Sequence, residues 1–108
     1  MGSLYHLIDA AALDAVRPSG TIEPGTEGFV HLSAGSQVAA TVGRHFAGRT
    51  EDLLVLELDD SRLSAVVWEE GEPGELFPHL HAPLPLDTVV SVRRWSEDIG
   101  AHLAADHS

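Results

Sequence analysis

The chain has 108 residues, which is the length of one domain and too short for a second hydrophobic core. Apolar residues make up 44% and charged residues 21%, as in ordinary globular proteins, so extensive disorder is excluded. There are 17 acidic residues and 6 basic ones, all arginine, and the net charge is −11. Because polyanions are bound by clustered cations, this charge argues against nucleic-acid and membrane partners but permits a small ligand, for which one or two arginines can form a local anion site.

Cysteine is absent, which excludes disulfides, thiolate metal sites and a cysteine nucleophile. The N-terminus shows no basic segment followed by a long apolar run, so no signal peptide is expected. No stretch approaches the ~20 apolar residues that a membrane helix needs. We therefore expect a cytoplasmic protein.

The first half of the chain predicts two strands, each followed by a helix. The apolar run 4–8 indicates a strand, and the alanine-rich segment 10–16 indicates a short helix that ends before Pro18. Residues 17–28 are rich in Pro, Gly, Thr and Glu and predict a loop. A second strand is expected over 29–32. A second helix is expected from about residue 33 to Phe46, where Val38, Val42 and Phe46 form one apolar stripe.

The second half predicts mainly strands. Residues 53–58 are almost continuously apolar, which indicates a strand buried on both faces. Further strands are expected over 63–68, ending at Glu69 and Glu70, and over 89–95. Prolines 78, 83 and 85 predict an irregular or edge segment over 77–85, because proline cannot donate a ladder hydrogen bond. The pattern indicates one α+β domain over 1–98 with two short helices, followed by a frayed tail over 99–108.

Two of the seven histidines lie inside short apolar strands. A polar ring in such a strand must face a partner or a cavity, and this applies to His6 and to His31. A single histidine in such a strand is more often a core residue with one hydrogen bond than a ligand-binding residue. Because both strands precede helices, we expect a shared cleft. His45 is expected to cap a helix end, and His102 and His107 fall in the predicted tail.

A second group of candidates lies between residues 68 and 81. His79 and His81 are two residues apart, so on an extended segment they share a face and could hold a metal if His31 or Glu69 came close. The simpler interpretation is an exposed proline-rich loop, and we expect no metal. Glu69 beside Trp68 could be a desolvated acid or base, although a glutamate pair at a strand end is more often solvated.

Three groups of segments together resemble a known family. They are Leu4-Tyr5-His6; Gly28-Phe29-Val30-His31-Leu32-Ser33 with Arg44-His45-Phe46-Ala47-Gly48; and Trp68-Glu69 with Leu76-Phe77-Pro78-His79-Leu80 and Pro83-Leu84-Pro85-Leu86. The chain resembles a family of small bacterial and plant domains of unknown function, grouped with the ADP-ribosyltransferase fold. That resemblance implies a split antiparallel or mixed sheet with NAD or a similar nucleotide bound in a cleft.

The resemblance also implies roles for single residues. Tyr5 and His6 match a first-strand motif whose histidine holds ribose hydroxyls, and His31 and Ser33 match the second-strand motif of RNA 2′-phosphotransferases. The third motif, which usually supplies a glutamate, falls on Glu69 or on the stretch from Phe77 to His79. His6, His31, Glu69 and His79 are thus the expected catalytic residues. Ligand contacts are expected from the remaining candidates, which are Tyr5, Ser33, Arg44, Trp68 and Phe77.

Three functions stay open on the sequence. The first is a small domain that binds NAD or an ADP-ribose-like nucleotide in a cleft lined by His6 and His31 and that, if it is an enzyme, is an ADP-ribosyltransferase-like transferase or NAD glycohydrolase. The second is a non-catalytic ligand- or protein-binding domain that has kept the fold. The third is a metal-dependent hydrolase that uses His79 and His81.

Overall fold

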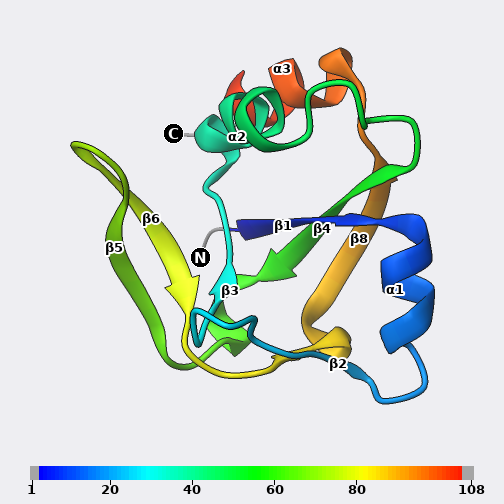
Figure 1. Cartoon of the computed structure of the whole chain (residues 1–108), viewed down its shortest axis with the longest axis vertical. Coiled ribbons are helices and arrows are strands. Elements are labelled where there is room, and N and C mark those ends of the chain that lie inside the picture. Colours follow the sequence, from blue (N-terminus) through cyan, green and yellow to red (C-terminus); the bar gives the residue numbers. More distant parts are fainter. Residues whose placement is uncertain (1–2, 106–108) are drawn as a thin grey trace.

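The computed structural model describes residues 3–105, which form three α-helices and three small antiparallel sheets (Figure 1). The elements are, in chain order, β1 (Ser3–Asp9), α1 (Ala10–Val16), β2 (Thr21–Ile22), β3 (Val30–His31), η1 (Gly35–Gln37), α2 (Val38–His45), β4 (Leu53–Asp59), η2 (Asp60–Arg62), β5 (Val66–Glu72), β6 (Glu75–Leu80), β7 (Leu84–Pro85), η3 (Leu86–Thr88), β8 (Val89–Arg94) and α3 (Glu97–Ala105). The predicted single-domain α+β class is confirmed. Among residues 3–105, no helix has the length and apolarity needed to cross a membrane.

The largest core surrounds β4, the middle strand of the sheet β1-β4-β8. Leu56 and Leu58 point into one apolar cluster, which includes Leu13 of α1. Leu53 and Val55 point into a second cluster beneath α2 and α3. Because side chains alternate along a strand, the continuous apolar run supplies both clusters, and the predicted burial on both faces is confirmed.

The C-terminal segment differs from the predicted tail. Residues 97–105 form α3, and the Ser96 hydroxyl accepts a hydrogen bond of 3.1 Å from the backbone N–H of Ile99 at its start. Leu103 is only 4% exposed and packs in the cluster beneath α2. The expectation of a frayed segment from residue 99 is therefore wrong as far as residue 105, because Leu103 and Ile99 give the helix an apolar face. Residues 106–108, with His107, lie outside the described part of the chain.

The prediction for residues 77–85 is also wrong over its first part. β6 is the middle strand of the sheet β3-β6-β5, with Pro78 in its interior. The Pro78 carbonyl accepts a hydrogen bond of 3.1 Å from the N–H of Leu32, just beyond β3. In an antiparallel ladder, the nitrogen and the oxygen of one residue face the same neighbour. The proline nitrogen therefore faces the short β3, and the long ladder to β5 loses no donor.

β5 and β6 form a hairpin that projects from the body of the molecule (Figure 1). Its strands run further than predicted, because β5 continues to Glu72 and the connection is a tight turn at Pro73 and Gly74. Gly74 has a φ of 81°, which favours glycine. A bulge between Glu70 and Glu72 shifts the register near this turn.

A backbone bridge joins the two larger sheets. Tyr5 of β1 and Ser33 exchange two backbone hydrogen bonds of 2.8 Å, which forms an isolated antiparallel bridge. This bridge holds the chain after β3 beside β1. The first and second predicted strand motifs therefore lie next to each other in space.

Candidate functional site

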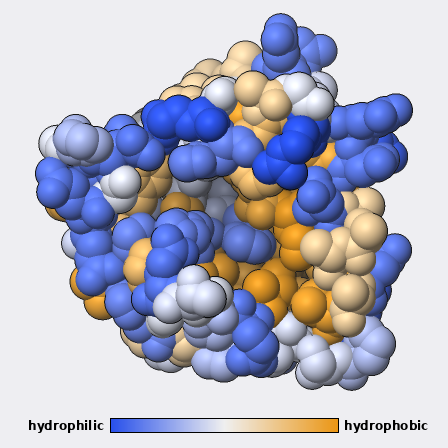
Figure 2. Space-filling view, in the orientation of Figure 1, coloured by the Kyte–Doolittle hydropathy of each residue, from blue (hydrophilic) through white to orange (hydrophobic). Residues whose placement is uncertain are grey.

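A cleft of about 540 Å³ lies between α2, the β5–β6 hairpin, the middle of β1 and the chain around β3. Figure 2 shows the molecule hollowed between the hairpin and α2, with hydrophilic side chains around much of the rim. Concave sites of this size are typical of small-ligand pockets. Within the described residues we take this cleft as the candidate site.

Six of the nine residues singled out from the sequence line this cleft. They come from four different parts of the chain and are His6, His31, Ser33, Arg44, Phe77 and His79. The spatial neighbourhood of His6 and His31 follows from the bridge between β1 and the chain after β3. Whether these residues bind or react with a ligand stays a prediction.

The other three candidates lie away from the cleft lining. Tyr5 is buried in the core cluster beneath α2 and α3. Trp68 pairs with Pro78 across the hairpin and is 49% exposed, on the sheet face opposite to Glu69 and His79. Glu69 contacts His79 instead of lining the cleft itself. Trp68 is therefore not placed to stack on a ligand in this cleft.

The hydrogen bond of His6 determines which ring nitrogen faces a ligand. Its Nδ1 lies 2.8 Å from the backbone carbonyl oxygen of His31. A carbonyl only accepts, so Nδ1 carries the hydrogen. Burial lowers the pKa of His6 from its ordinary value of 6.5, which keeps the ring neutral near pH 7. The remaining nitrogen, Nε2, is then a hydrogen-bond acceptor in the cleft wall.

His31 lines the same cleft and is largely exposed. Its Nε2 donates to a carboxylate oxygen of Glu27 at 2.9 Å. Phe29 lies edge-on to the His31 ring at 4.8 Å and stacks on the His79 ring at 4.0 Å between centroids. Our sequence analysis missed Glu27 and Phe29. The signal for Phe29 was its position two residues before His31, which places both side chains on one strand face.

The α2 side of the cleft carries the guanidinium of Arg44, which is paired with a glutamate of the hairpin. The Arg44 Nε lies 3.2 Å from a carboxylate oxygen of Glu72, and its guanidinium sits 5.6 Å from the centre of the Phe77 ring. His45 reaches the same Glu72 oxygen at 3.7 Å. His45 is the last residue of α2, which confirms its predicted place at a helix end. The contacts link α2 to the hairpin across the cleft.

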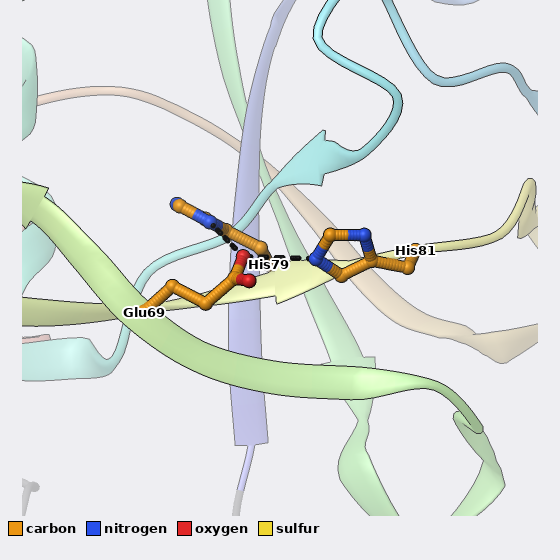
Figure 3. Close-up of side chains that lie close together, drawn as sticks. All are labelled: Glu69, His79 and His81. Atoms are coloured by element: carbon orange, nitrogen blue, oxygen red, sulfur yellow. Dashed lines mark hydrogen bonds and ion pairs between the residues drawn. The ribbon is translucent and has the colours of Figure 1, made fainter.

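Glu69, His79 and His81 form a compact cluster (Figure 3). The same carboxylate oxygen, Oε1 of Glu69, lies 2.8 Å from Nδ1 of His79 and 2.8 Å from Nε2 of His81. The hydrogen bonds from His81 and His79 hold the pKa of Glu69 below its usual value, so the carboxylate is ionised near neutral pH. His79 is 4% exposed, whereas Glu69 and His81 are partly open to solvent.

Comparison with known proteins places the chain in a family. A family described as protein of unknown function DUF952 matches residues 7–92. The crystal structure of protein CC0527 from Caulobacter crescentus is 31% identical, with a TM-score of 0.81 over 94% of this chain and 98% of that one. The solution structure of the same protein gives 31% identity and a TM-score of 0.79, over 98% and 100% of the two chains.

No curated protein matches the sequence. The family match covers most of the chain, and the likeness to CC0527 extends over nearly all of it in both sequence and fold. The chain therefore belongs to the DUF952 family.

Proposed function

We propose that the cleft binds a nucleotide of the NAD or ADP-ribose class. The observation that carries this proposal is that His6 and His31, from two different sheets, line one cleft together with Arg44. A polar acceptor, a cation and aromatic faces in one concavity are the groups that a ribose, a phosphate and a base require.

Each group has a defined role in this proposal. The Nε2 atom of His6 accepts a hydrogen bond from a ribose hydroxyl, because its Nδ1 is already committed to the His31 carbonyl. Arg44 exchanges its exposed contact with Glu72 for a phosphate oxygen, which its planar guanidinium can bind with two hydrogen bonds. The ring of Phe77, which also lines the cleft, provides a flat apolar face for a base.

The proposal includes the grouping with the ADP-ribosyltransferase fold, which rests on the first two histidine motifs. Glycosyl transfer from NAD in the glutamate-type enzymes of that fold requires a carboxylate at the reacting ribose. Glu69 does not line the cleft and is held by two imidazoles, and Glu72 is paired with Arg44. These pairings favour the second candidate function, a binding domain without turnover, over a glutamate-type transferase.

Isothermal titration calorimetry with NAD, ADP-ribose and nicotinamide, in buffer with EDTA, tests the proposal. We expect NAD or ADP-ribose to bind with one site per chain. His6→Ala and Arg44→Ala should weaken binding at least about tenfold, because each removes one polar contact to the ligand. His102→Ala is the matched control, since this exposed histidine lies on α3 outside the cleft lining.

Two outcomes would count against the proposal. One is the absence of binding by a folded wild-type chain, and the other is equal affinity in wild type and in both cleft variants. Chromatography of NAD incubated with the protein separates the two candidate functions. Release of nicotinamide that depends on His6 indicates an enzyme, and intact NAD with retained binding indicates a binding domain.

A further inference from the structure

We propose that Glu69, His79 and His81 form a site for one divalent transition-metal ion of the zinc class. The three donor atoms all lie within 4.8 Å of one another, and both ring nitrogens approach the same carboxylate oxygen (Figure 3). This inference goes beyond the proposed nucleotide binding and does not depend on it. It also departs from our sequence-based expectation that the chain takes no metal.

The hairpin brings the three side chains together. Val67 pairs with His79 and Glu69 pairs with Phe77, so Glu69 and His79 lie on the same face of neighbouring strands. His81 follows two residues later, and its backbone N–H donates to the Ala65 carbonyl at 3.0 Å, which extends the ladder past the end of β6. The cluster is therefore built on paired backbone rather than on a free loop.

The donor set selects the class of metal. Two imidazole nitrogens and one carboxylate oxygen suit Zn²⁺, or Fe²⁺ in a two-histidine, one-carboxylate arrangement, and they are a poor match for Mg²⁺ or Ca²⁺, which prefer oxygen. Three protein ligands leave a fourth position open for water or for a ligand atom, as in catalytic zinc sites.

The geometry requires only a local adjustment. Ligands at about 2.0–2.2 Å from a tetrahedral ion are roughly 3.4 Å apart, whereas Glu69 Oε1 now lies 2.8 Å from each nitrogen. Glu69 and His81 are 39% and 38% exposed at their side chains and can turn. His79 is buried and stacked under Phe29, so it serves as the fixed ligand.

The electrostatic setting favours a cation. In the described part of the chain, the ion-pair partners of Glu69 are these two imidazoles and no arginine. Neutral imidazoles are the form that binds metals. On binding, the ring hydrogen that now points at the carboxylate would move to the other nitrogen of the same ring, which frees the lone pair of the ligating nitrogen for the ion. The net charge of −11 raises the local concentration of cations at the surface.

The alternative is a closed hydrogen-bond network that orients His79 and binds no ion. Titration of tag-free, EDTA-treated and dialysed protein with Co²⁺, followed by Zn²⁺ competition, distinguishes the two. We expect visible absorption bands of four-coordinate Co²⁺ that saturate at one equivalent and disappear when Zn²⁺ is added.

Three variants locate the site. His81→Ala and Glu69→Gln should each weaken Co²⁺ binding at least about tenfold, since loss of residues that only support a metal ligand already costs that much. Glu69→Gln keeps the size of the side chain, so it serves if His81→Ala is poorly folded by circular dichroism. His102→Ala should bind Co²⁺ as wild type does.

The proposal fails if folded wild-type protein shows no saturable Co²⁺ spectrum. It also fails if the spectrum survives in Glu69→Gln and His81→Ala, because the ion would then be held elsewhere. The nucleotide titrations are done in EDTA and need no metal. A failure of Co²⁺ binding therefore does not count against nucleotide binding, and a failure of nucleotide binding does not count against the metal site. An affinity for Co²⁺ that is the same with and without NAD would show that the two ligands bind independently.

Discussion

Replacement of Leu103 by alanine tests whether the C-terminal helix is part of the core. Leu103 is 4% exposed and packs in the cluster that contains Tyr5, Val38 and Leu53. Truncating a buried leucine costs about 2–5 kcal/mol, and a helix at a chain end can partly close the gap, so we expect a loss of about 3 kcal/mol in the free energy of unfolding. For a domain of this size, that loss lowers Tm by roughly 12–24 °C.

Urea unfolding followed by tryptophan fluorescence measures this change directly, because Trp95 packs against the same cluster. His102→Ala is the control, since this neighbouring side chain is exposed and its loss should cost less than about 0.5 kcal/mol. If Leu103→Ala also cost less than about 0.5 kcal/mol, α3 would contribute nothing to stability. The original expectation of a frayed tail would then be right.

Three further substitutions test single features of the fold. Ala65 has a φ of 63°, a left-handed conformation that strains a residue with a Cβ. Ala65→Gly should therefore raise the free energy of unfolding by about 0.5–1 kcal/mol, and a lower value in urea unfolding would contradict this strain. A Cβ on Gly35 would lie 2.8 Å from the backbone oxygen of Leu103. Gly35→Ala should therefore lower the free energy of unfolding by about 1–3 kcal/mol, and an unchanged Tm would exclude that close approach. Burial lowers the pKa of His6, so the unfolded chain takes up a proton first as pH falls below about 6.5, and stability is lost there. His6→Gln should therefore lose less stability between pH 7.5 and 5.5 than wild type in the same assay, and equal losses would mean that His6 does not titrate abnormally.

The strands and the fold class were predictable where one local signal dominated. The run 53–58 is apolar at nearly every position, and this pattern has few interpretations besides a strand covered on both sides. Pro78 misled the prediction because the rule against proline in inner strands assumes a long neighbour on each side. Here the missing donor faces the side of the two-residue β3, so the long ladder to β5 keeps all of its donors. For α3, the signal was present in Ser96 and in Leu103, four residues after Ile99.

The candidate site was predictable only in part, for a reason of register. His6 and His31 could be grouped because each interrupts an apolar strand. The approach of Glu69 to His79 and His81 depends on the turn at Gly74 and on the bulge before it, which shift the pairing of the hairpin. A slip of one residue would turn Glu69 to the other face of the sheet. Sequence spacing alone does not contain that information.

The single bridge between Tyr5 and Ser33 has a consequence for the order of folding. The β5–β6 hairpin joins residues close in the chain, and such hairpins form in about 1–10 μs. β1 instead pairs with β4, where Leu4 lies opposite Leu58, and this closure of a long loop is slow. The bridge also joins segments that are distant in the chain. We therefore expect the hairpin with its Glu69 cluster to form before the wall that contains His6.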